Sequence, residues 1–172
     1  RELLDNKVVR CNDILILLRS RTHLSDYEAA LRDSQIPYLS QDRGTLLESL
    51  EIRDMEALLK VLMTPQDNLS LAQVLRSPLF SIDHGTLLQL AQGPAGSWFE
   101  RLTTPATIND NPALARAAQL LTAWQQLAGR IPIHDLLETI FHQANVIPRY
   151  AAAFPAIHVP GVKANLIRFI EL

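Results

Sequence analysis

Two arginines and a serine directly follow a short apolar segment near the start of the chain. Residues 13–18 read D-I-L-I-L-L, and Arg19, Ser20 and Arg21 come next. A short continuous apolar run is typical of a β-strand that is buried on both faces. Guanidinium and hydroxyl groups at the end of such a strand suit the phosphates of a nucleic-acid backbone. The competing interpretation is an arginine that pairs with an acidic side chain on a neighbouring helix.

Arg43, Gly44 and Thr45 form a second candidate for contact with DNA or with a neighbouring domain. Glycine adopts the positive φ angles of tight turns at no steric cost, and we expect such an angle at Gly44. The exposed amides of a turn can hold a phosphate. A turn without a ligand explains the same residues, and we favour that interpretation.

His134, Glu138 and His142 recur at steps of four and would share one face of a helix. Zinc takes such side chains as ligands. The H-E-x-x-H pattern is missing from the sequence, however, and no fourth ligand is evident. We therefore expect an ordinary solvated helix face and no metal site.

The aromatic residues Trp98, Phe99 and Trp124 could stack on nucleic-acid bases. Trp124 follows an apolar helical stripe, so core packing explains it better. No Ser-His-Asp, Cys-His or paired-carboxylate arrangement stands out for hydrolysis. The sequence thus favours binding over catalysis by this chain.

The elements that would position Arg19 follow from hydrophobic periodicity. A helix is predicted over residues 24–33, where apolar residues recur at spacings of three and four. Residues 36–39, I-P-Y-L, are a second strand candidate. Strand, helix and strand in this order predict a parallel β-α-β unit with a right-handed crossover. Ligands of open α/β sheets lie beyond the carboxyl ends of strands, where Arg19 would stand.

The rest of the chain predicts helices only, apart from turns. They are expected at residues 50–63, 70–76, 84–91, 97–102, 113–128, 132–144, 148–154 and 162–172. Glu51 and Asp54 fall in the first turn of one of them, where carboxylates interact favourably with the helix dipole. Pro65 ends that helix, and we place a subdomain boundary there, between residues 1–66 and 67–172. The predicted fold class is mainly α with a small parallel β-α-β element.

Composition narrows the class of protein. The 172 residues are 48% hydrophobic and carry a net charge of −2. Such a chain is globular, and the near-neutral charge argues against tight independent binding of nucleic acid. Cys11 stands alone, so we expect a reducing compartment. Because we find no signal-peptide pattern and no apolar run of about 18 residues, we expect a cytoplasmic protein that does not contact a membrane.

Several motifs resemble UvrD/Rep-type superfamily 1 DNA helicases, in the segment that opens the second half of their motor. That segment begins D-I-A-[IV]-L-x-R-[ST] and continues through a helix ending E-A-L, G-I-P-Y, a glycine turn and E-[IV]-[RK]-D. The matching residues here are Asp13, Ile14, Leu17, Arg19, Ser20, Glu28, Ala30, Leu31, Ile36, Pro37, Tyr38, Gly44, Glu51, Ile52, Arg53 and Asp54. Residues 74–80, V-L-R-S-P-L-F, resemble the RecB/AddA helicase–nuclease branch, which includes the exonuclease V beta subunit.

The sequence also departs from this family. The turn keeps one glycine where the family has two, and Leu24-Ser25 replaces a Ser-Arg pair. No G-x-x-x-x-G-K-[ST] loop occurs in the 172 residues, so these residues cannot build a P-loop. The resemblance therefore implies an inactive piece of a larger helicase.

The resemblance implies a division of labour within that piece. Residues 1–66 would belong to a RecA-like 2A subdomain that grips single-stranded DNA, with Arg19 facing the strand. Residues 67–172 would form an all-helical 2B-like subdomain that regulates unwinding and touches duplex DNA or a partner subunit. ATP and Mg²⁺ would be cofactors of the parent protein, which acts in DNA repair and recombination, and not of this fragment. A cut sheet would expose a strand edge, which invites dimer formation.

The alternative function is a helical interaction module that docks a partner subunit without touching DNA. Cations are sparse after residue 76, which favours packing or regulation for the helical part. An exposed apolar patch would mark such a module. A DNA-contacting surface would instead show clustered arginine and lysine.

Overall fold

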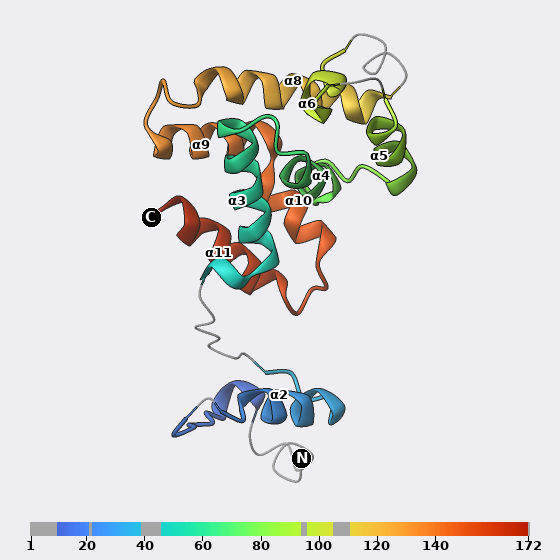
Figure 1. Ribbon diagram of the computed structural model, residues 1–172. Helices are drawn as coiled ribbons and strands as arrows, with labels where there is room; N and C mark the ends of the chain where they lie inside the picture. Colours follow the sequence, from blue (N-terminus) through green and yellow to red (C-terminus); the bar gives the residue numbers. More distant parts are fainter. Residues whose placement is uncertain (1–9, 21, 39–45, 94–95, 105–110, 172) are drawn as a thin grey trace. The chain divides into compact units, whose positions relative to one another are not determined.

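The computed structural model describes residues 10–20, 22–38, 46–93, 96–104 and 111–171 (Figure 1). The chain divides by its internal contacts into two compact units, Arg1–Arg43 and Gly44–Leu172. All described residues of the buried apolar core, from Ile52 to Phe169, belong to the second unit. The predicted boundary at residue 66 concerns subdomains of a parent motor and stays a prediction.

The described part of the first unit contains a short 3-10 helix, η1 (Cys11–Asp13), and one α-helix, α2 (Leu24–Asp33). The prediction of α2 is confirmed. The prediction of a strand over residues 13–18 is wrong, because residue 13 ends η1 and residues 14–18 belong to no regular element. Residues 36–38 of the second strand candidate are likewise irregular.

The β-α-β element is thus absent from the described residues, and the predicted fold class is corrected to helical. A strand is stable only where a neighbouring strand forms hydrogen bonds with its backbone N–H and C=O groups. No described residue of the first unit does this, and the apolar run lies open: Leu15 is 80% exposed and Leu17 83%. The dimer was expected to form through an exposed sheet edge. Because the described residues form no sheet, the structure gives no support for such a dimer.

All regular elements in the described part of the second unit are helices. After a 3-10 helix, η2 (Leu46–Glu48), they run in this order: α3 (Leu50–Met63), α4 (Asn68–Arg76), α5 (His84–Ala91), α6 (Trp98–Leu102), α8 (Pro112–Leu127), α9 (Ile133–Ala144), α10 (Val146–Ala153) and α11 (Val159–Ile170). No described helix is long and apolar enough to cross a lipid bilayer.

Polar side chains fix where several of these helices begin. Asp67 accepts a hydrogen bond from the amide of Ser70, and Asp83 accepts one from the amide of Thr86. These contacts satisfy amides that have no partner within the helix. Asn145, with a φ of 51°, separates α9 from α10 and redirects the chain between them.

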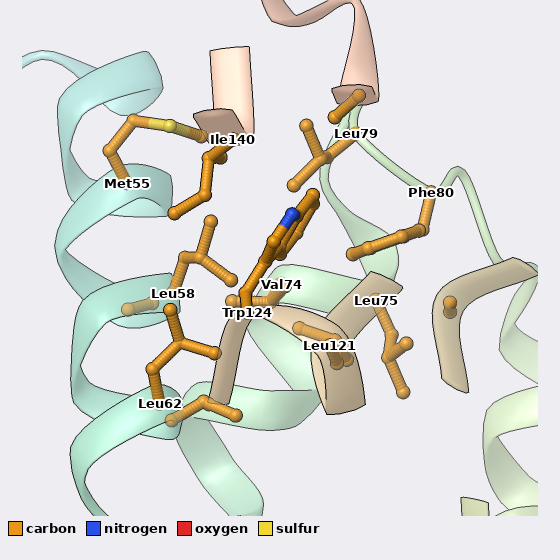
Figure 2. Close-up of a cluster of buried hydrophobic side chains, with 14 of the residues drawn as sticks. Met55, Leu58, Leu62, Val74, Leu75, Leu79, Phe80, Leu121, Trp124 and Ile140 are labelled. Carbon is orange, nitrogen blue, oxygen red and sulfur yellow. The ribbon is translucent and has the colours of Figure 1, made fainter. Parts of the chain in front are cut away.

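The core forms where α3, α4, α8 and α9 converge (Figure 2). Trp124 of α8 lies at its centre and is fully buried, and its indole Nε1 donates to Gln143 Oε1 at 2.8 Å. The prediction that Trp124 packs in a core is confirmed. Helix α3 packs against α4, α8 and α11, so it connects the early helices to the last ones (Figure 1).

Candidate nucleic-acid interface

Arg19 and Ser20 lie exposed on the segment between η1 and α2. Ser20 Oγ is 3.3 Å from Thr22 Oγ1. The competing interpretation of Arg19 was an ion pair with an acidic side chain on a neighbouring helix. Among the described residues, no ion pair includes Arg19. Arg21 lies outside the described residues. The structure therefore leaves the DNA-binding role of these residues a prediction.

The two acidic residues nearest to Arg19 in sequence are engaged elsewhere. Asp13 accepts a hydrogen bond from the backbone amide of Arg10 at 3.0 Å, and its carboxylate lies 3.5 Å from the Arg10 Nε. Asp26 Oδ2 lies 3.2 Å from His23 Nδ1. These short-range contacts leave the charge of Arg19 open to a ligand from outside.

Arg43, Gly44 and Thr45 lie outside the described residues. The structure therefore does not test the positive φ expected at Gly44. Their contact with DNA or a neighbouring domain stays a prediction.

The N-terminal part of α3 carries a polar cluster, buried at Glu51 and half-buried at Asp54, that the sequence did not reveal. Glu51 is only 4% exposed, and its Oε1 accepts a hydrogen bond of 2.7 Å from Asn165 Nδ2 on α11. Asp54 accepts from Gln73 Nε2 on α4 at 3.1 Å and from the Tyr150 hydroxyl on α10 at 2.9 Å. The helix dipole alone does not account for these carboxylates, because they also join α3 to three other helices.

Two groups of this cluster, Asp54 and Tyr150, have shifted pKa values. Burial raises the pKa of Asp54 above its ordinary value, hydrogen bonds from Gln73 and Tyr150 oppose the change, and the charge of Glu51 adds to it. Burial and then the charge of Asp54 raise the pKa of Tyr150 far above its ordinary value. Tyr150 therefore stays protonated and donates to Asp54 throughout the physiological range. The cluster connects helices, and we assign it no catalytic role.

His134 and Glu138 share one face of α9 as predicted, and His134 also contacts the last residue of α11. His134 Nδ1 lies 3.0 Å from the carbonyl oxygen of Ile170, and His134 Nε2 lies 3.4 Å from Glu138 Oε1. His142 and Glu138 border an open hollow of about 500 Å³ whose floor is largely apolar. Across the described ranges, no three His, Cys, Asp or Glu side chains gather as a metal site would require.

Comparison with known families identifies the class of protein. Residues 1–104, more than half of the chain, match the model of the UvrD-like helicase C-terminal domain. The chain belongs to this family. The matched range includes the Arg19 segment, the first turn of α3 and the L-R-S-P-L-F motif.

Individual relatives narrow the branch. The chain is 32% identical over 146 residues to the exonuclease/helicase subunit RexA of Lactococcus lactis, covering 77% of this chain and 12% of that protein. It is 28% identical over 149 residues to an ATP-dependent helicase/nuclease subunit of Listeria innocua, covering 84% and 12%. The corresponding subunit of Carboxydothermus hydrogenoformans is 28% identical over 171 residues, covering 97% and 15%.

These matches confirm the resemblance to UvrD-type helicases of the RecB/AddA branch. The chain spans only 12% to 15% of the length of these relatives. What it shares with them is therefore one region of a much longer protein.

Proposed function

We propose that this chain forms part of an ATP-dependent DNA helicase or helicase–nuclease that acts in DNA repair and recombination. The family match over residues 1–104 carries the proposal. The names of the relatives, which are helicase/nuclease and exonuclease/helicase subunits, support it. In this proposal residues 1–66 serve the 2A subdomain, and residues 67–172 form a helical 2B-like subdomain that regulates unwinding.

Arg19 and Ser20 contact the backbone of single-stranded DNA in this proposal. Arg21, Arg43, Gly44 and Thr45 are the further candidates for contact with DNA. The exposure of Arg19 and the local engagement of Asp13 and Asp26 support the role, since they leave the guanidinium free of acidic partners among the described residues. Arginine binds phosphate through a planar set of N–H donors.

A paired substitution tests this contact. Replacing Arg19→Gln should weaken binding of a labelled oligo-dT strand at low salt, on the order of fivefold, because one phosphate contact is lost. Arg32→Gln is the matched control, because it removes an exposed cation of the same unit whose Nη2 donates to the Tyr38 hydroxyl. Fluorescence anisotropy titrations over a range of salt measure both. Equal weakening in the two variants would contradict a specific role for Arg19.

ATP and Mg²⁺ belong to other parts of the parent protein in this proposal. The 172 residues contain no P-loop sequence, so the residues present do not fit the nucleotide. The purified chain should release no phosphate from ATP, with or without oligo-dT, in a coupled phosphate-release assay. Turnover that persists through purification and depends on this chain would overturn the assignment to a motor fragment.

A second function, docking of a partner subunit without DNA contact, is favoured by one observation. Met63 and Leu69 flank the turn between α3 and α4 and are 72% and 82% exposed. Apolar side chains this exposed suit a protein interface. The absence of salt-sensitive binding to any oligonucleotide would favour this alternative over the DNA-contact role.

A further inference from the structure

Arg116 of α8 is held in place by three contacts from other elements. Its Nη1 donates to the carbonyl oxygen of Leu79 at 3.2 Å, and its Nη2 reaches the carbonyl oxygen of Ala144 at 3.5 Å. The guanidinium carbon lies 5.7 Å from the centre of the Phe80 ring, a cation–π distance. Because these contacts fix a half-buried side chain, the position of its charge is set before any ligand arrives.

Arg149 places a second positive charge near the first. Its backbone amide donates to the carbonyl of Asn145 at 3.1 Å, and Asn145 directly follows the Ala144 that Arg116 contacts. Partial burial, and after it the charge of Arg149, lower the pKa of Arg116. Both arginines thus belong to the junction of α9 and α10, Arg116 through its contact with Ala144 and Arg149 through its backbone hydrogen bond to Asn145.

No carboxylate among the described residues compensates this pair. The ion pairs of the described chain involve Arg10, His23 and His134, and neither Arg116 nor Arg149. The Arg149 guanidinium also makes no hydrogen bond within the described ranges. Both arginines stay charged, since arginine does not lose its proton in proteins. The fixed guanidinium of Arg116 and the half-buried side chain of Arg149, neither with a carboxylate partner among the described residues, attract an anion from solution.

We propose that Arg116 and Arg149 bind a phosphate of a nucleic-acid backbone. The Arg149 guanidinium presents a planar fork of donors that matches phosphate oxygens, and Arg116, whose Nη1 and Nη2 already donate to carbonyls, contributes its fixed charge. Backbone contacts of this kind position a protein on nucleic acid. The choice of nucleic acid over another anion rests on the proposed function. The site belongs to the second unit, whereas Arg19 belongs to the first, so the two contacts can be tested separately.

The test uses the whole 172-residue chain with labelled oligo-dT and a labelled duplex, titrated by fluorescence anisotropy over a range of salt. Arg149→Gln should weaken binding on the order of fivefold and reduce the slope of log affinity against log salt by about 0.9 on duplex and about 0.7 on single strands. Arg130→Gln is the control, because Arg130 is an exposed cation in the turn after α8. Its affinity and slope should match those of the unsubstituted chain. A thermal melt of each variant verifies that both are folded.

Four results would overturn the proposal. They are no binding to either oligonucleotide, equal losses in Arg149→Gln and Arg130→Gln, equally tight binding of labelled poly-glutamate, and displacement of the DNA by inorganic phosphate at matched ionic strength. The third would identify an acidic peptide as the ligand, and the fourth a small free anion. A loss in Arg19→Gln without a loss in Arg149→Gln would refute this site alone and leave the proposed function intact.

Discussion

Asp54 shows how burial and hydrogen bonding compete at a single residue. The carboxylate accepts hydrogen bonds from Gln73 and Tyr150, which favour its charged form, while burial raises its pKa and prevails. The folded state therefore holds the Asp54 proton more tightly than the unfolded state does. Its stabilising contribution is fully present below the unfolded pKa and is lost as the pH rises through the folded pKa.

Replacing Asp54→Asn should therefore raise the free energy of unfolding at neutral pH. The amide removes the partly buried charge and keeps an acceptor for the Tyr150 hydroxyl. Its NH2 group faces Gln73, whose side-chain amide can turn so that its oxygen accepts. We expect a gain below about 1 kcal/mol, because the exposed part of the carboxylate is screened by solvent. Urea unfolding at neutral and at mildly acidic pH measures it, and the difference between variant and unsubstituted chain should shrink as the pH falls.

Glu56→Gln provides the control for this experiment, because it removes a carboxylate from the same helix without touching the contacts of Asp54. It should not reproduce the change in pH dependence. If Asp54→Asn instead destabilises the chain at neutral pH, the hydrogen bonds of the ionised carboxylate outweigh the cost of its burial.

The sequence alone indicated the roles of some of these residues and gave no sign of the roles of others. The motif around Arg19 and the apolar stripe of Trp124 could be identified from short stretches of sequence. The partners of Glu51 and Asp54 could not, because Asn165 and Tyr150 lie 114 and 96 positions away from them in the chain. Local spacing contains no information about contacts of this range.

The helices were predictable because their signals are local. Apolar periodicity and flanking breakers placed α2 and α3 at their observed limits, and Pro112 marked the start of α8. Helix α4 begins two residues earlier than expected, because Asp67 caps it. The strand predictions were wrong for the opposite reason. A helix contains its own hydrogen-bond partners, whereas a strand needs a second segment beside it, and a local sequence pattern does not identify that segment.

The start of α8 provides a test at this scale. Asn111 Oδ1 accepts hydrogen bonds from the amides of Ala113 at 2.9 Å and Leu114 at 3.3 Å. Asn111→Ala removes both, and the free energy of unfolding should fall by about 1 kcal/mol. Asn111→Asp keeps the acceptor and adds a charge that the helix N-terminus favours, so it should be neutral or stabilising. Chemical denaturation compares the two, and equal losses would show that the cap contributes nothing.

For the whole molecule, the division into two units predicts where stability resides. The described core contains only residues from Ile52 onward, and none of the described residues 10–38 contributes to it. The region that matches the family and the region that forms the core therefore overlap only in part. The family match covers residues 1–104, whereas the core runs from Ile52 through α11. The part of the chain with the strongest motif, around Arg19, is the part with the least packing.

A chain reduced to residues 44–172 should accordingly keep the thermal transition of the full chain, with a midpoint changed by less than about 2 °C, since a loss of 1 kcal/mol would shift it by at least about that much. Removing residues 159–172 instead deletes Val162, Leu166 and Phe169 from the core and should lower the midpoint strongly or prevent folding. Far-UV circular dichroism melts of the three chains distinguish these outcomes. A clear drop on removing residues 1–43 would contradict the prediction that stability resides in the second unit.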